Sequence, residues 1–308
     1  MKDLAGKVAV ITGAGSGFGR EFARIGAREG MKLVLADVQQ DALDEAVAEA
    51  RAAGVEAQGL RVDVSKPEDV ERLAVCAVGK FRAVHLLFNN AGVAGGGGYV
   101  WESSPKDWEW LLGVNLMGVV NGIRSFVPLM LKQDCECHVV NTASAAGLVS
   151  APLMSVYNVS KHAVVTLSET LFHDLRLAKA KMGVSVLCPA YVPTNIRSAE
   201  RNRPPELADD APPTPSQIAA RERSEKAIAS GRLGAAEVAR MTFDSVRDDR
   251  FYVITHPKML KSVELRLQDV LAQRNPSDPY TFKPALSPGG GSSAGSPPAP
   301  AGGGRSRA

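Results

Sequence analysis

The chain has 308 residues, of which 45% are hydrophobic and 22% charged, a composition typical of a globular protein long enough to bury one large core. Its 36 basic and 33 acidic residues leave a net charge of +3, and no long basic run could follow a phosphate backbone, which argues against a nucleic-acid partner. No apolar run approaches the ~20 residues of a bilayer-spanning helix, and the first apolar stretch is too short for a signal peptide. We therefore expect a cytoplasmic protein with no membrane partner.

Short apolar runs alternate with longer segments of helical spacing along most of the chain. Strands are expected at residues 8–12, 32–36, 57–62, 84–88, 138–142, 184–187 and 251–255. Helices are expected near residues 18–29, 41–53, 67–78, 108–131, 155–181 and 235–248. The strands are almost continuously apolar, which is typical of a parallel sheet covered by helices on both faces. The pattern predicts an α/β protein with a seven-stranded parallel sheet in one catalytic domain, residues 1–257.

Two later segments depart from this alternation. Residues 198–231 are rich in proline, arginine and glutamate and follow the sixth strand, where an open α/β sheet binds ligands. We expect a mobile substrate lid over about residues 195–231, with a solvated insertion as the alternative. Residues 258–284 are expected to form a C-terminal helical extension. From residue 285 to 308 the composition falls to Pro, Gly, Ser and Ala, which predicts a disordered tail.

The four cysteines are Cys76, Cys135, Cys137 and Cys188, too few and too scattered for a disulfide framework. The group from Cys135 to His138 offers a zinc site as one interpretation. Its C-x-C spacing lacks the usual loop between paired ligands, and no second pair lies nearby, so a polar turn leading into a strand is favoured. We expect reduced thiols and no metal.

The first predicted strand runs directly into a glycine-rich turn, Thr12-Gly-Ala-Gly-Ser-Gly-Phe-Gly19, where a helical pattern begins. Gly13, Gly17 and Gly19 would let a pyrophosphate approach backbone N–H groups at the positive end of the helix. The pattern is T-G-x-x-x-G-x-G and not G-x-G-x-x-G, because Phe18 takes the last glycine position, and a purely structural turn remains the alternative. Ser16 and Phe18 join the predicted cofactor-binding set.

The second predicted strand ends at Asp37, twenty positions after Gly17. A carboxylate there can accept hydrogen bonds from ribose hydroxyls and would repel a 2′-phosphate, and no basic residue stands at Ser16 or Val38. The sequence therefore favours NAD over NADP, with a simple turn before the next helix as the alternative for Asp37. Asp63 ends the third strand, where it would reach the adenine edge or help to start the next helix.

Tyr157 and Lys161 are four residues apart in a helical segment, so their side chains share one face. A phenol has a pKa of ~10, and a nearby ammonium and the positive nicotinamide ring would both favour the phenolate as a proton acceptor. A surface pair is the alternative for this spacing alone. Thirteen residues earlier, Ser144 ends the fifth strand, where a small donor could hold a substrate oxygen. Asn89-Asn-Ala-Gly92 ends the fourth strand, and we favour a sheet-stabilising role over a border to the cofactor.

Together these motifs resemble those of the short-chain dehydrogenase/reductase family over about residues 7–257. The resemblance rests on T-G-A-G-S-G-F-G, the pair Asp63 and Val64, N-N-A-G, Asn115, Ser144 and the Y-N-V-S-K run that ends at Lys161. It implies a three-layer doubly wound Rossmann fold. It further implies that Tyr157 is the acid/base, Ser144 orients the substrate oxygen, Lys161 binds the nicotinamide ribose, Asn115 holds a water in a proton relay and Thr194 contacts the carboxamide. The implied cofactor set also includes Val64, Asn90, Ala91, Gly92, Pro189 and Val192.

The resemblance implies an NAD-dependent oxidoreductase that interconverts a secondary alcohol and its ketone. The expected walls, residues 95–99 with Leu148, Leu153, Met154, Tyr191 and the lid, are mainly apolar or flexible, which favours an apolar or aromatic substrate. Residues 110–130 resemble the corresponding helix of bacterial dehydrogenases that oxidise benzylic alcohols in lignin-type aryl ethers. Ala190 departs from the family, which commonly has glycine there, and its methyl group would narrow the pocket.

Two other functions stay open. One is an NADPH-dependent carbonyl reductase, and the other is a catalytically idle NAD-binding sensor or scaffold, which would not need Ser144, Tyr157 and Lys161 together. In relatives the helices expected at residues 108–131 and 155–181 pair across subunits, so the resemblance implies a homotetramer or a homodimer.

Overall fold

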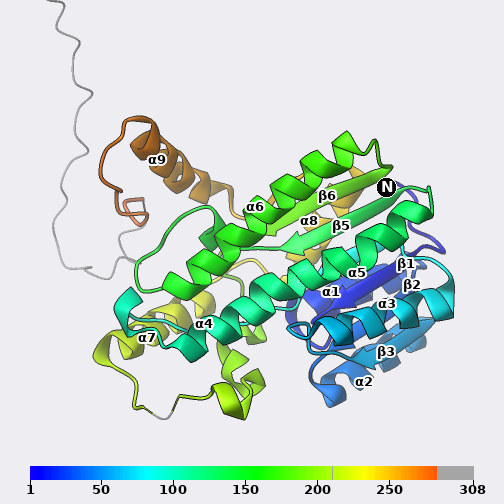
Figure 1. Ribbon diagram of the computed structural model, residues 1–308, viewed down its shortest axis with the longest axis horizontal. Coiled ribbons are helices and arrows are strands. Elements are labelled where there is room, and N and C mark those ends of the chain that lie inside the picture. The colour runs from blue at the N-terminus through cyan, green and yellow to red at the C-terminus, as the bar shows by residue number, and fades with distance from the viewer. Residues whose placement is uncertain (210, 283–308) are drawn as a thin grey trace, which may run out of the picture.

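Seven parallel strands form one sheet in the computed structural model, which describes residues 1–209 and 211–282 (Figure 1). The strand order is β3-β2-β1-β4-β5-β6-β7. The strands are β1 (Val8–Thr12), β2 (Lys32–Asp37), β3 (Ala57–Arg61), β4 (Leu86–Asn89), β5 (Cys137–Thr142), β6 (Met182–Cys188) and β7 (Tyr252–Ile254). This confirms the predicted seven-stranded, doubly wound α/β fold, with strand ends within a few residues of those expected.

Helices cover both faces of the sheet. The side of α1 (Gly17–Arg28), α2 (Gln40–Ala52) and α8 (Ala235–Arg247) encloses one core cluster. There the ring of Phe88 stacks on Phe22 at 4.4 Å and lies 5.5 Å from Phe243, joining β4 to two helices. The other side carries α3 (Pro67–Phe81), α5 (Gly118–Lys132) and α6 (Ser155–Leu177) over a second cluster. Burial of both faces explains why the strands are almost continuously apolar.

The strand order reverses between β1 and β4, whose neighbours lead away in opposite directions. At such a point the loops that follow the two strands run in opposite directions and leave a crevice between them. Open α/β sheets bind their ligands in this crevice. In Figure 1 this end of the sheet faces α7 (Pro215–Ala229) and α4 (Pro105–Leu112), while the N-terminus lies at the opposite end. The first glycine turn and the loops after β4, β5 and β6 therefore meet at one edge.

The helix predicted at residues 108–131 is a composite of three parts. Between α4 and α5 lies a π-helix, η2 (Gly113–Met117). By length and composition alone, Pro105–Lys132 is apolar enough for a membrane-crossing helix, so the expectation that no run comes near that length is wrong for this segment. Core helices of soluble proteins pass the same test, and 44% of the tested window is buried. The window also buries the amides of Asn115 and Asn121.

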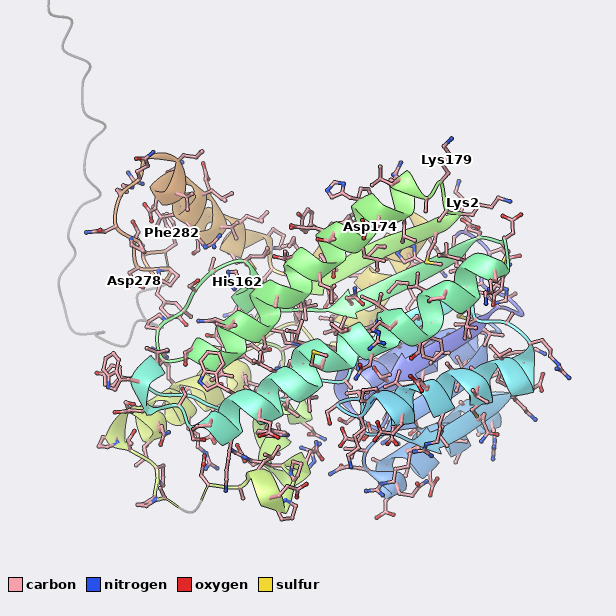
Figure 2. All side chains as sticks on the ribbon, viewed as in Figure 1. Lys2, His162, Asp174, Lys179, Asp278 and Phe282 are labelled. Atoms are coloured by element: carbon pink, nitrogen blue, oxygen red, sulfur yellow. The ribbon has the colours of Figure 1, made fainter. Side chains whose placement is uncertain are left out.

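The segment expected to be a lid is largely helical. It contains the 3-10 helices η4 (Asn195–Asn202) and η5 (Pro205–Leu207), followed by α7. After β7, η6 (Pro257–Met259) leads into α9 (Leu260–Leu271), which stands out from the body at the lid end of the molecule (Figure 1). Asp278 and Phe282, labelled in Figure 2, lie at that same end, whereas Lys2 and Lys179 lie at the other. The predicted tail at residues 285–308 lies outside the described residues.

Candidate active site

A cavity of about 1480 Å³ opens at the carboxyl ends of the strands and brings most of the predicted site residues together. Loops from both halves of the sheet line it. The predicted residues in its wall are Gly13, Ser16, Gly17, Phe18, Asp37, Asp63, Val64, Asn90, Ala91, Gly92, Ser144, Met154, Tyr157, Lys161, Pro189, Tyr191, Val192 and Thr194. Gly19 and Asn115 do not reach the cavity surface, and neither do Tyr99 and Leu148, two of the expected substrate walls.

The glycine turn is shaped so that side chains would not fit. Gly13 and Gly17 have φ values of +66° and +53°, in the left-handed region that favours glycine. A Cβ on Gly13 would come within 2.8 Å of the Ala91 backbone, and one on Gly19 would overlap the Gly13 carbonyl oxygen. The turn therefore packs directly against the loop after β4 and presents bare backbone at the start of α1, which is the geometry that suits a pyrophosphate.

Asp37 lies at the end of β2 with both carboxylate oxygens held by backbone groups. Gly15 N–H donates to Oδ2 at 2.8 Å and Gln39 N–H to Oδ1 at 3.0 Å, so the side chain is fixed beside the glycine turn. Asp63 accepts bonds at one oxygen from the Ser65 backbone (3.0 Å) and hydroxyl (2.7 Å). Asp63 thus both lines the cavity and helps to form the turn into α3, so its two interpretations are compatible.

Asn90 ties together three strand ends. Its Nδ2 donates to the Thr12 carbonyl oxygen at 2.9 Å, and its Oδ1 accepts from the Thr142 hydroxyl at 3.3 Å. Its own backbone N–H donates to the Thr12 hydroxyl at 2.9 Å. These bonds agree with the sheet-stabilising role favoured for the N-N-A-G motif, although Asn90 also lines the cavity.

Ser144 and Tyr157 meet across the cavity wall. The Ser144 hydroxyl donates to the Pro189 carbonyl oxygen at 3.3 Å and accepts a hydrogen bond from the Ala146 N–H at 3.1 Å. Removal from water raises the pKa of Tyr157, a hydrogen bond with Ser144 lowers it, and the nearby Tyr191 raises it further, for a net rise. For the chain's own groups burial therefore outweighs the hydrogen bond, and the effect expected of the ammonium and the nicotinamide ring together stays a prediction.

Lys161 is only 3% exposed, one helical turn after Tyr157. Its Nζ donates to the Thr142 carbonyl oxygen at 3.0 Å and lies 5.7 Å from the centre of the Tyr157 ring. Burial lowers the pKa of this amine from 10.5 to about 8. The lysine is thus held at the end of β5 by one backbone carbonyl and remains mainly protonated at neutral pH.

Asn115 lies in the π-helix and is fully buried, 0% exposed. Its Oδ1 accepts from the Val93 N–H at 2.8 Å, and its Nδ2 donates to the Val93 carbonyl (3.0 Å) and to the Ser160 hydroxyl (3.2 Å). The side chain therefore joins the loop after β4 to the helix of Tyr157. A π-helix displaces backbone carbonyls from their regular partners and often occurs at functional sites.

An ion pair fixes the first part of the lid segment to α4. Arg203 bonds Asp107 at 2.9 Å, and the two side chains are only 9% and 5% exposed. The Arg203 guanidinium also lies 5.1 Å from the centre of the Trp110 ring and donates to the Leu207 carbonyl at 2.7 Å. Since losing one partner would leave a buried charge, this contact holds residues 203–209 firmly over the cavity.

Helix α7 is attached at its start and in its middle. At its start Thr214 closes a capping box with Gln217, and the Glu102 carboxylate accepts from the hydroxyls of Thr214 and Ser216. Further along, Arg223 donates to the Pro152 carbonyl oxygen at 2.7 Å, in the loop that leads to Tyr157. The lid segment thus bridges the loops after β4 and β5 and closes the cavity.

Several wall residues were not predicted. They include Glu102, Asp107, Trp110 and Tyr280, whereas Glu200, Arg203 and Ile228, which also line the cavity, belong to the segment expected to be the lid. Of these, Ser104-Pro-Lys-Asp107 carries a capping-box pattern that could have identified Asp107 as a helix-start residue, and the structure has that capping box. The others have no local signal, because they reach the cavity only when segments far apart in the sequence come together.

No cysteine is among the described residues that line the cavity, although Cys188, at the end of β6, lies close enough to Lys161 for the two to interact electrostatically. Cys135 and Cys137 have Sγ atoms 3.8 Å apart, and all four cysteines are free thiols. Within residues 1–209 and 211–282, no group of three or more His, Cys, Asp or Glu side chains could hold a metal ion.

The residues present fit a dinucleotide. The glycine turn is packed so closely that a Cβ at Gly13 or Gly19 would clash, a carboxylate stands at the end of the second strand, and the cavity continues from there to Ser144 and Tyr157. A dinucleotide needs each of these in turn: bare backbone for its phosphates, an acceptor for its ribose and room beside the reacting groups.

Comparisons with known proteins agree with this geometry. The model of a family described as short chain dehydrogenase matches residues 7–205. A crystal structure of a short chain dehydrogenase/reductase from Burkholderia phymatum in complex with NAD has a TM-score of 0.89 and 57% identity, covering 90% of this chain and 99% of the other.

Two curated relatives have activities in their names. A CLA biosynthesis dehydrogenase/reductase of Lactiplantibacillus plantarum is 33% identical over 90% of this chain and 97% of its own. A C alpha-dehydrogenase of Sphingobium sp. is 33% identical over 91% of this chain and 90% of its own.

Proposed function

The chain belongs to the short-chain dehydrogenase family and is an oxidoreductase of that kind; from this premise we propose that it interconverts a secondary alcohol and its ketone, with NAD as the cofactor. The observation that carries the proposal is the convergence of Ser144, Tyr157 and Lys161 on a cavity that continues to the glycine turn and Asp37. An idle NAD-binding scaffold would have no need for this group.

The chain's own residues divide the chemistry among them. The hydroxyls of Ser144 and Tyr157 hold the substrate oxygen, and Tyr157 takes the hydroxyl proton during oxidation and returns it during reduction. Bound NAD supplies the acceptor for the hydride. Because the pKa of Tyr157 is raised by burial, alcohol oxidation should increase with pH, whereas ketone reduction needs the protonated phenol and should not.

Lys161 and Asn115 organise this pair. The Lys161 ammonium, anchored on the Thr142 carbonyl, would bind the nicotinamide ribose and stabilise negative charge on Tyr157. The side-chain bonds of Asn115 hold the π-helix against Val93 and Ser160, so we propose that its contribution to a proton relay comes through the backbone and not through its amide. Thr194 and the glycine turn would hold the two ends of the cofactor.

The substrate class follows from the wall. Leu153, Met154, Ile228 and Trp110 make much of it apolar, which suits an apolar or aromatic secondary alcohol. The test is a screen of aliphatic and aromatic secondary alcohols with NAD and with NADP at alkaline pH, followed at the reduced cofactor's absorbance. Turnover of apolar secondary alcohols with NAD supports the proposal, and preference for NADPH and ketones would support the carbonyl reductase instead.

Asp37 provides the prediction on cofactor choice. Changing it to serine together with Val38→Arg removes a negative charge and adds a positive one beside the 2′ position. We expect kcat/KM with NAD to fall about 10-fold or more and kcat/KM with NADP to rise by a similar factor, which corresponds to roughly 1.4 kcal/mol each. The measurement is kcat/KM for both cofactors with one alcohol. The control is Asp41→Ser, an acidic residue in the first turn of α2 that does not line the cavity. An unchanged cofactor ratio in the double variant would contradict the role of Asp37.

We also propose a homotetramer or homodimer. The support is the exposed apolar side chains on the two long helices, Met117 and Leu131 on one and Val159 and Leu177 on the other. Location in the cytoplasm stays a prediction.

A further inference from the structure

The C-terminal extension reaches back into the cavity that contains the reacting groups. Pro279, Tyr280 and Phe282 line the same cavity as Ser144 and Tyr157, although the family model ends at residue 205. Tyr280 is only 7% exposed, while its neighbour Phe282 is 50% exposed. Figure 2 places Phe282 and Asp278 beside α9 at the lid end of the molecule. This short segment is therefore part of the wall.

Specific contacts hold Tyr280 in place. The Ser262 hydroxyl on α9 donates to the Pro279 carbonyl oxygen at 2.8 Å, and the Tyr280 N–H donates to Asp278 Oδ1 at 2.9 Å. The guanidinium of Arg223, on α7, lies 5.5 Å from the centre of the Tyr280 ring. Its Nη2 atom donates a hydrogen bond to the Pro152 carbonyl oxygen. The ring is thus sandwiched between the extension and the lid helix, in a fixed position.

The hydroxyl of Tyr280 faces that of Tyr191 at 3.3 Å. Tyr191 follows β6 by three residues and is near enough to Tyr157 that its charge raises the pKa of Tyr157. Each phenol has one proton, and a hydrogen bond between the two oxygens uses only one of them. The other hydroxyl therefore has a proton for which no acceptor is found among the described residues. Burial, chiefly, raises the pKa of Tyr280, so this phenol stays protonated and remains a donor.

We propose that Tyr280 is a specificity-determining residue, which together with Tyr191 donates a hydrogen bond to an oxygen acceptor on the substrate away from the reacting carbon. The proposal rests on the proposed function and deepens it. Leu153, Met154 and Ile228 contribute apolar groups to the same wall. A part-buried donor pair beside such groups selects against a substrate that leaves it without a partner. The substrate class is then an apolar or aromatic secondary alcohol that carries one ether, carbonyl or hydroxyl oxygen on its far side.

The test compares two alcohols that differ in one atom. Each is a 1-arylethanol, and the ring carries either a methoxy group or an ethyl group of similar size. Tyr280→Phe removes the donor and keeps the ring. For this variant we expect kcat/KM for the methoxy alcohol to fall about 10-fold, mainly through KM, and that for the ethyl alcohol to change less than about 2-fold. NAD affinity, measured by quenching of protein fluorescence, should not change.

Two further variants complete the experiment. Tyr191→Phe removes the other hydroxyl and should reduce the same discrimination, which keeps the test decisive if Tyr280→Phe folds poorly. The matched control is Tyr252→Phe, because Tyr252 is 45% exposed, bonds Glu169 and does not line the cavity. It should leave both alcohols unaffected.

The outcomes separate the two proposals. One outcome is that the wild type oxidises both alcohols while Tyr280→Phe and Tyr191→Phe show the same ratio of kcat/KM between the two alcohols as the wild type. In that case the role of Tyr280 is overturned and the proposed function stands. If the wild type oxidises no secondary alcohol with either cofactor, the proposed function fails, and the role of Tyr280 fails with it.

Discussion

Replacing Tyr157 by phenylalanine should reduce kcat/KM for alcohol oxidation about 10³-fold, close to 4 kcal/mol of transition-state stabilisation. The change removes the hydroxyl that we propose takes the substrate proton beside Ser144. It should not disturb the wall, because Ser144 keeps its bonds to Pro189 and Ala146 and the ring of residue 157 stays in place. The measurement is steady-state kinetics with NAD, together with the dissociation constant for NAD.

The control for this loss is the binding of NAD itself. The glycine turn and Asp37, which we propose hold the adenosine half of NAD, make no hydrogen bond with Tyr157 in the described part of the chain, so the dissociation constant should stay within about 3-fold of the wild type, below the effect of one ordinary hydrogen bond. If Tyr157→Phe kept a tenth or more of the wild-type rate, another group would have to be the acid/base. If it lost NAD binding as well, the loss of rate would not identify the proton acceptor.

Replacing Lys161 by methionine should have opposite effects on activity and on stability. Turnover should fall about 10²-fold or more, since the phenolate of Tyr157 loses its ammonium neighbour. The free energy of unfolding at pH 7 should rise by about 2 kcal/mol. Burying this amine, whose pKa falls from 10.5 to about 8, costs the wild type about 3 kcal/mol. The variant avoids this cost but loses the hydrogen bond to the Thr142 carbonyl, which contributes about 1 kcal/mol.

The stability gain should depend on pH in a defined direction. The pKa of Lys161 is lower in the folded protein than in the unfolded chain, so between pH 8 and 10.5 the unfolded chain binds more protons and wild-type stability rises with pH. Below about pH 8 the wild type bears the full cost. The advantage of Lys161→Met should therefore be largest at pH 7 and shrink by pH 10, as measured by urea unfolding at both values.

An exposed lysine supplies the matched control. Lys132 ends α5 at the surface, and Lys132→Met should change the unfolding free energy by less than about 0.5 kcal/mol and leave turnover intact. A destabilised Lys161→Met at pH 7 would mean that the ammonium is a net stabiliser of the fold, contrary to its burial.

The strand and helix pattern was predictable because it depends on local periodicity. Apolar runs in the strands and the 3.6-residue period of the helices predicted all seven strands and the six helices that cover the sheet. The parallel sheet then placed the residues after β1, β4, β5 and β6 at one edge, so Ser144 could be expected beside Tyr157 from its position at the end of a strand.

Other features did not follow from local pattern. The helix expected at residues 108–131 contains a π-helix at Asn115, whose buried amide is fixed by Val93 and Ser160. The segment after β6 was expected to be a mobile lid; its sequence did not reveal that it contains α7 or that Arg203 bonds Asp107, and its mobility stays a prediction. A periodic pattern cannot reveal such contacts, since a single ion pair between distant segments leaves no repeat in the sequence.

The amino-acid sequence alone determined the glycine turn, the carboxylate of Asp37 and the shared helix face of Tyr157 and Lys161, because each depends on residues within one turn or one strand-to-helix connection. Only the tertiary structure decided that the Tyr157 pKa is raised, that Lys161 is buried against Thr142, and that Tyr280 enters the same cavity from 123 residues further along the chain. The physical reason is that desolvation and wall shape are set by everything that packs around a group, and most of those neighbours are distant in sequence.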